Sequence, residues 1–104
     1  MTDYAHVQSI SLQAIKVFQE LHDGAVLSGG PLTAPGSAGF VIDCKKTHHR
    51  LLVTTLDREP GKCALVLADL NDPNAEVNTP FEVLPLVEVS VLTLVNLMET
   101  KFAK

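Results

Sequence analysis

The chain has 104 residues, a length typical of one domain, which we assign to residues 1–104. Its net charge of −4, with six acidic and no basic side chains in residues 63–100, disfavours general nucleic-acid binding, which depends on cationic side chains. Hydrophobic residues make up 46% of the chain, more than a small domain with a high surface-to-volume ratio easily buries, which favours self-association.

The first predicted element is an amphipathic helix over residues 4–22. Thr2 or Asp3 is a suitable N-cap, and Gly24 a suitable stop. Leu12 falls outside the apolar stripe, so it is either exposed or a partner contact. The stripe has helical spacing and consists of Val7, Ile10, Ala14, Val17, Phe18 and Leu21.

The segment from Gly24 to Ile42 carries no charged residue and several glycines, and we interpret it as a long loop. Such a loop is a mobile connector or a cover for a ligand, with backbone N–H groups available to an anion. It leads from a helix into a strand, however, whereas phosphate-binding loops lead from a strand into a helix. A short strand at residues 25–27 is an alternative for part of it.

Three Val-, Leu- and Ile-rich segments, residues 39–44, 50–56 and 62–70, predict an antiparallel meander. In that arrangement Cys44 and Cys63 lie at opposite ends of the middle strand, about 20 Å apart at 3.3 Å per residue. An intrachain disulfide is therefore excluded. Two reduced thiols are typical of a cytoplasmic protein.

After a predicted turn at residues 71–74, residues 77–83 alternate as a half-buried strand, and Pro80 favours a sheet edge. Pro85 is well placed at the start of a closing helix. A strand over residues 87–91 is the rival interpretation. The helix stripe is Val87, Val91, Leu94, Val95, Met98 and Phe102, and the off-stripe residues are Val89, Leu92 and Leu97. The N-terminal helix or a second subunit is expected to cover these three.

Residues 44–50 gather three of the eight Lys and Arg residues and two of the four histidines. This basic tip is a candidate surface for an acidic protein partner or a small anionic ligand. A solvated hairpin end would have the same composition. The candidate binding residues are Lys45, Lys46, His48, His49 and Arg50.

The cysteines and histidines do not predict a metal site, because their spacing lacks the short paired units of structural zinc sites. A cysteine enzyme would use Cys44 with His48 or His49 as base and Asp43 to orient it. These residues all lie in one short segment, whereas catalytic groups usually converge from separate elements. We therefore expect no metal, no cofactor and no catalytic residue.

Residues 1–6 lack the features of a secretory signal, and Glu82, Pro85 and Glu88 interrupt the apolar run of residues 81–98. We expect a cytoplasmic protein with no membrane partner. The predicted fold is α+β, with an N-terminal helix, a meander of three to four strands and a C-terminal helix. The favoured function is a non-enzymatic protein-interaction module (an adaptor, chaperone-like protein or inhibitor), homo-oligomeric through its C-terminal helix. The alternative is a small-ligand or anion-binding protein that uses residues 24–42 and the basic tip, and a Cys/His enzyme is third.

Overall fold

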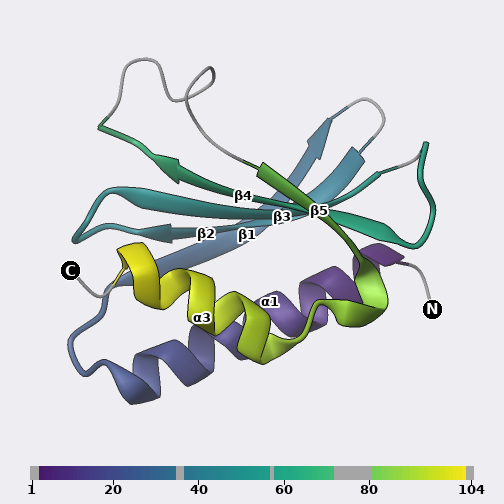
Figure 1. The fold of residues 1–104 in the computed structure, drawn as a ribbon. Helices are drawn as coiled ribbons and strands as arrows, with labels where there is room; N and C mark the ends of the chain where they lie inside the picture. The colour runs from purple at the N-terminus through teal and green to yellow at the C-terminus, as the bar shows by residue number, and fades with distance from the viewer. Residues whose placement is uncertain (1–2, 35–36, 57, 72–80, 103–104) are drawn as a thin grey trace.

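The computed structural model describes residues 3–34, 37–56, 58–71 and 81–102. The strands of this part of the chain form one antiparallel sheet in the order β1-β2-β3-β4-β5, so each strand pairs with its neighbour in sequence (Figure 1). This confirms the predicted α+β fold, with five strands in place of three to four. In chain order the elements are α1 (Asp3–Leu21), β1 (Leu27–Ala34), β2 (Ser37–Cys44), β3 (His49–Thr55), β4 (Lys62–Asp69), β5 (Phe81–Pro85), the 3-10 helix η1 (Leu86–Glu88) and α3 (Val91–Lys101).

The additional strand β1 lies in the segment that the sequence predicted to be a loop, and that prediction was wrong. β1 pairs with β2 along its whole length, from Leu27 opposite Cys44 to Ala34 opposite Ser37. A β-carbon at Gly29 would lie 2.7 Å from Phe40 Cε1 and 2.8 Å from Ile15 Cδ1, so glycine lets α1 approach the strand closely. Pro31 is compatible with this strand because β1 is at the sheet edge.

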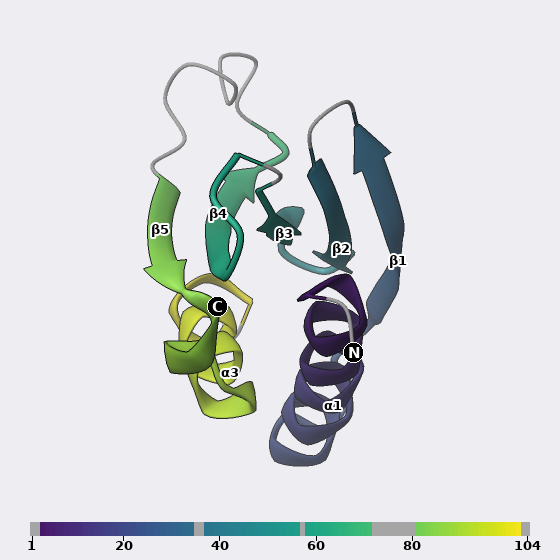
Figure 2. The ribbon, with the colours of Figure 1, turned by 90° about the vertical axis from the view of Figure 1, so that its right-hand side faces the viewer.

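Both helices cover the same face of the sheet, and no helix of the described residues lies on the other face (Figures 1 and 2). Alternation along each strand sends every second side chain toward the helices. Phe40, Ile42, Leu51, Val53 and Leu65 are buried on this inner face. One hydrophobic core therefore lies between the helix layer and the sheet.

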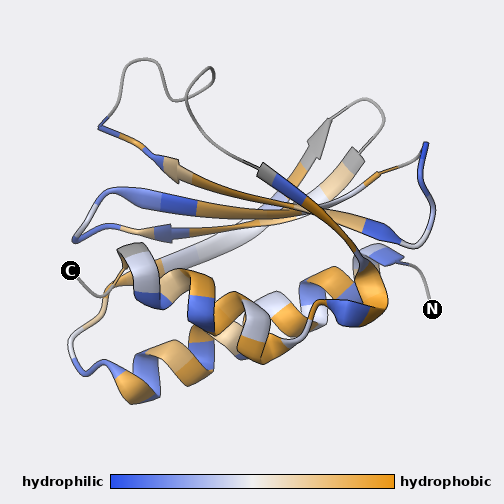
Figure 3. Ribbon diagram, viewed as in Figure 1, coloured by the Kyte–Doolittle hydropathy of each residue, from blue (hydrophilic) through white to orange (hydrophobic). Residues whose placement is uncertain are grey.

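The predicted stripe of α1 is confirmed over most of its length. The buried positions Val7, Ile10, Ala14 and Phe18 follow the helical repeat, whereas the predicted members Val17 and Leu21 are exposed. Leu12 is 50% exposed, as its place outside the stripe implied. Gly24 follows the helix with a φ of +89°, a conformation that glycine adopts at little cost. The apolar stripes of both helices are visible in Figure 3.

The closing helix begins later than the sequence predicted. Pro85 is the last residue of β5, where it pairs with Lys62, and the rival strand over residues 87–91 is not formed either. Ser90 is the N-cap of α3, because its hydroxyl accepts a hydrogen bond from the Thr93 N–H at 3.2 Å and Thr93 Oγ1 reciprocates with the Ser90 N–H. Pro80 lies outside the described residues, but β5 is an edge strand as expected.

The two cysteines lie on β2 and β4, beside opposite ends of β3, as predicted. Cys44 is opposite His49 at the start of this strand, and Cys63 is opposite Thr55 at its end. Both thiols are unpaired and buried. Among the described residues, no helix has the length and apolar character required to cross a membrane.

Candidate functional site

The five candidate residues of the basic tip do not share one surface. Lys45, Lys46 and His48 are exposed in the turn between β2 and β3. His48 has a φ of +57°, and its carbonyl accepts a hydrogen bond from the Leu70 N–H at 2.8 Å. This left-handed residue closes the turn and leaves its own side chain in solvent. Three residues of the tip are thus free to meet an acidic group.

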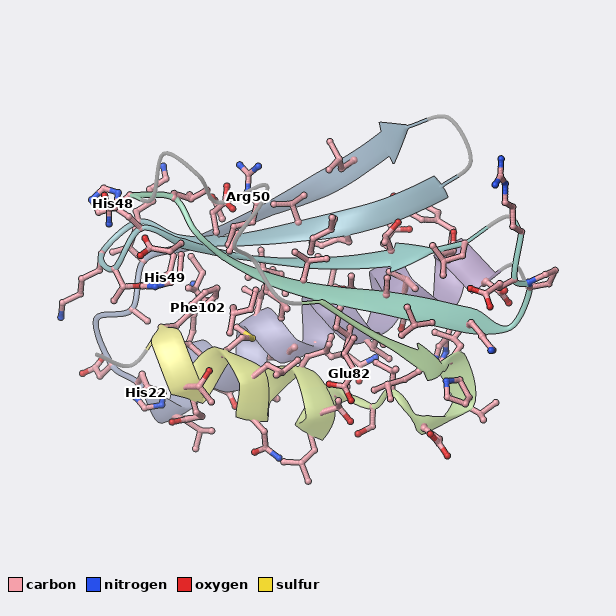
Figure 4. The ribbon with its side chains drawn as sticks, turned by 45° about the horizontal axis from the view of Figure 1, so that its top comes forward. His22, His48, His49, Arg50, Glu82 and Phe102 are labelled. Atoms are coloured by element: carbon pink, nitrogen blue, oxygen red, sulfur yellow. The ribbon has the colours of Figure 1, made fainter. Side chains whose placement is uncertain are left out.

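Arg50 and His49 diverge because neighbouring strand residues point to opposite faces of the sheet. Arg50 lies on the outer face, where its guanidinium donates to Asp43 Oδ1 and Oδ2 at 2.7 and 3.1 Å. His49 lies on the inner face, on the side of Phe102 (Figure 4). Its Nδ1 is buried without a hydrogen-bond partner among the described residues. Neither side chain adds to a continuous basic surface with Lys45 and Lys46.

Cys44, His49 and Asp69 align across β2, β3 and β4 on the inner face. This order is suggestive of a cysteine nucleophile with a base and an orienting acid. The Cys44 thiol, however, is only 2% exposed and its described contact is the Phe102 carbonyl at 3.9 Å. Within the described residues, no hydrogen bond links Cys44 to His49, and no group of three potential ligands could hold a metal ion. The row lacks the access and the contacts that nucleophilic catalysis needs.

Cys63 is the more strongly perturbed thiol. Burial at the far end of the inner face raises its pKa from 9.0 to about 11, partly offset by a backbone hydrogen bond from Thr54. A thiol with so high a pKa is protonated near neutral pH, whereas a nucleophilic cysteine needs its thiolate form. Cys63 therefore has the properties of a core residue.

The three candidate interface residues of the C-terminal segment differ in exposure. Val89 is 2% exposed and belongs to the core of its own subunit. Leu97 is half-buried and packs against that core, whereas Leu92 is 66% exposed. Most of the apolar surface of this helix is covered within the chain, so Leu92 is the member of the set with surface to offer a partner.

The outer face of the sheet carries apolar side chains that were not among the residues predicted to form a site. The strand register groups its side chains into rows that run across the strands. A large-residue row consists of Val41, Leu52 and Val66 on adjacent strands, all half-buried. On the three central strands, the small-residue row beside it consists of Gly39, Thr54 and Ala64. The edge strands continue this row with Leu32 and Val83.

The neighbouring atoms of β3 leave no room for a side chain at Gly39. A β-carbon there would lie 2.7 Å from the Val53 carbonyl oxygen and 2.8 Å from Thr54 Cβ. On the three central strands, the side chains of the first row are therefore larger than those of the second. In the central strands of this face, Asp43 and Arg50 are the charged residues of the next row, and they neutralise each other.

A signal for this face was present in the sequence. Residues that alternate with the core positions of the strands, such as Val41, Leu52 and Val66, are as apolar as the core residues themselves. In an antiparallel sheet with one face in water, the second set is expected to be polar. The apolar residues of the outer face are therefore a departure from this pattern.

Comparisons with known proteins do not assign a function to the chain. No family model, no curated protein and no solved structure matches the chain.

Proposed function

We propose that this protein is a non-enzymatic interaction module that forms a homodimer through the outer face of its sheet. The observation that carries the proposal is the apolar large-residue row of Val41, Leu52 and Val66, on a face that neither α1 nor α3 covers. Burial of such a surface is the main favourable contribution to protein association. Sheets also pack face to face about 10 Å apart when both inner faces are apolar.

The shape of the face favours a second copy of the same chain as its partner. Consider a two-fold axis that lies in the plane of the interface, parallel to the two rows and midway between them. A rotation of 180° about this axis places a second copy face to face with the first and exchanges the large-residue row with the small-residue row. Each row of Val41, Leu52 and Val66 then lies over the row of Gly39, Thr54 and Ala64 of the other copy. An isologous interface requires this kind of self-complementarity.

Charge and size are compatible with the same partner. The chain is acidic overall, so two copies repel weakly, but the Asp43–Arg50 pair leaves the centre of the outer face neutral. Five strands about 4.8 Å apart and three rows about 7 Å apart give a face of roughly 500 Å². Two such faces reach about 1,000 Å², the lower limit of specific interfaces, so we expect a weak and reversible dimer.

The decisive experiment is light scattering coupled to size exclusion at low and high protein concentration. We expect a concentration-dependent dimer, which Leu52→Lys converts to a monomer because a charge then lies in the centre of the face. Leu92→Lys is the matched control, since it adds the same charge at an exposed leucine of α3. Val66→Thr, which keeps the β-branched shape, weakens the dimer without introducing a charge.

The outcomes separate the two possible interfaces. A monomer at high concentration in the unmodified protein contradicts the proposal. A dimer that Leu92→Lys disrupts and Leu52→Lys preserves places the interface on the C-terminal helix instead. Circular dichroism of each variant establishes that it is folded.

We also infer a cytoplasmic location for the module. Two buried, unpaired cysteines support this inference, because reduced thiols are the rule in that compartment. Fractionation of cells that produce the protein tests it, and recovery in a secreted fraction would contradict it.

A further inference from the structure

An open pocket of about 640 Å³ lies on the helix side of the molecule, away from the outer face of the sheet. It is formed where the first turns of α1 meet η1 and the start of α3, and Figure 2 views the molecule from this end. Its volume falls within the range of small-molecule sites. The lining residues are Asp3, His6, Ile10, Gln13, Gly61, Leu86, Val87, Val89, Ser90 and Val91.

The floor of this pocket is apolar and rigidly held. Ile10 and Leu86 are each 6% exposed and belong to the hydrophobic core, and Val91 packs against that core. Val87 stands at the pocket with 94% of its surface exposed. An alkyl or aryl group in the pocket would therefore cover apolar surface that now faces water, at about 25 cal/mol for each Å².

Donors and acceptors are both available to a ligand in the lining, and the His6 ring supplies at least one N–H donor. One oxygen of the Asp3 carboxylate accepts from the Gly61 N–H at 3.0 Å, which leaves the second oxygen available. One N–H of the Gln13 amide donates to Ser9 Oγ at 3.0 Å, which leaves the second N–H and the carbonyl oxygen available. Ser90 Oγ is already engaged in the cap of α3.

Asp3 is the one carboxylate among the residues that line the pocket, and His6 is the other titratable side chain there. No Lys or Arg lines it, and within the described residues Asp3 forms no ion pair. The nearby Lys62 forms its described ion pair with Glu59. The carboxylate is thus a negative charge beside an apolar surface, with no ion-pair partner among the residues that the structure describes.

We propose that this pocket binds a small hydrophobic ammonium compound, with the apolar body against Ile10 and Leu86 and the ammonium group at Asp3. A primary ammonium offers three N–H donors to the free oxygens of Asp3 and Gln13. The site does not depend on the dimer proposed above, because it lies on the helix layer.

Three compounds with the same tail test the proposal: n-hexylammonium, hexan-1-ol and hexanoate at pH 7 and equal ionic strength. In amide-resolved NMR titrations, we expect n-hexylammonium to shift the Gly61, Val89 and Val91 signals. We expect it to bind about fivefold more tightly than hexan-1-ol, as one partly exposed ion pair is worth up to about 1 kcal/mol. Hexanoate should bind most weakly, because its carboxylate meets Asp3.

Two variants assign the parts of the site. Asp3→Asn keeps an acceptor for the Gly61 N–H and should abolish the preference for n-hexylammonium over hexan-1-ol. Val87→Ser should weaken all three compounds by a similar factor, whereas the control Leu92→Ser, at an exposed leucine outside the pocket, should change none of them.

Equal binding of the three compounds by the unmodified protein would overturn the proposal. It would also be overturned by a preference for n-hexylammonium that survives Asp3→Asn, or by signal shifts that lie elsewhere on the molecule. If Asp3→Asn loosens the start of α1, Gln13→Leu provides the second variant, since it removes the other acceptor from an exposed position.

Discussion

Arg50 and Asp43 stand directly opposite each other on β3 and β2, and the guanidinium donates two hydrogen bonds to the carboxylate. The hydrogen bond to Asp43 raises the pKa of Arg50 above its ordinary value. The pair removes a cation from the basic tip and leaves the centre of the outer face neutral. One contact therefore weakens the anion-site hypothesis and supports the proposed dimer.

The coupling between these two residues can be measured with Asp43→Asn, Arg50→Met and the double variant. Because both side chains are partly exposed, we expect a coupling energy of about 0.5 kcal/mol, within the range of cross-strand ion pairs. The measurement is urea unfolding followed by circular dichroism, since the chain has no Trp. All proteins are compared at one concentration, because dimer formation adds to apparent stability.

A control for this cycle is the exposed pair of Lys62 and Glu59, whose nitrogen and oxygen are 3.5 Å apart. We expect its coupling to be smaller than that of Asp43 and Arg50, which form two shorter hydrogen bonds. A larger coupling in the control pair would contradict the importance given to the Asp43–Arg50 geometry.

Gly29 should not tolerate a methyl group, although the neighbouring Gly30 should. A β-carbon at Gly29 meets Phe40 and Ile15 at less than 3.0 Å, whereas at Gly30 it meets no atom within 4 Å. We expect Gly29→Ala to destabilise the protein by about 1–2 kcal/mol through overpacking. Gly30→Ala should be neutral or slightly stabilising, because it restricts the unfolded chain.

The cause of the Gly29 effect can be tested with Ile15→Val, which removes the Cδ1 atom that lies 2.8 Å from the added carbon. The loss caused by Gly29→Ala should be smaller in the Ile15→Val background than in the unmodified protein. If the two changes are additive, the close approach of α1 to β1 is not the source of the effect.

The sequence predicted the parts of the fold in which apolar residues recur with a regular helical or strand spacing. The stripe of α1 and the two strands that flank the turn at residues 45–48 were placed correctly because the apolar spacing allows one arrangement. β1 was missed because its glycines and Pro31 are typical of loops. They fit a strand here only because β1 is an edge strand packed tightly beneath by α1.

The candidate sites were less predictable, because they depend on which face each side chain occupies. Arg50 and His49 are adjacent in sequence but lie on opposite sides of the sheet (Figure 4). Asp3 and Gly61 are 58 positions apart and share one hydrogen bond at the edge of the pocket. A single sequence contains no periodic signal for a contact of that kind.

Ser90 should contribute more to stability than its exposed position suggests. Its hydroxyl accepts the Thr93 N–H and thereby satisfies a backbone donor at the start of α3. We expect Ser90→Ala to cost about 1 kcal/mol and Ser90→Asp, which keeps an acceptor, to cost much less. Ser9→Ala, an exposed serine within α1, is the control. Equal effects of Ser90→Ala and Ser9→Ala would show that the cap is unimportant.

We expect the protein to lose stability in alkaline solution because the Cys63 thiol is buried. Folding raises the pKa of this fully buried thiol from 9.0 to about 11, so below pH 9 it is protonated in both the folded and the unfolded chain. Between about pH 9 and 11 the unfolded chain loses its proton first, and the free energy of unfolding should fall by about 2–3 kcal/mol at most. Urea unfolding at several pH values measures this slope.

Cys63→Ala isolates this contribution, because tyrosine and lysine groups titrate equally in both proteins. The variant should be less stable near pH 7, since it leaves a small cavity at a buried position. Its stability should then fall less steeply than that of the unmodified protein as the pH rises from 9 to 11. Parallel pH profiles for the two proteins would mean that the thiol is no harder to ionise in the folded chain, and that Cys63 is accessible to solvent.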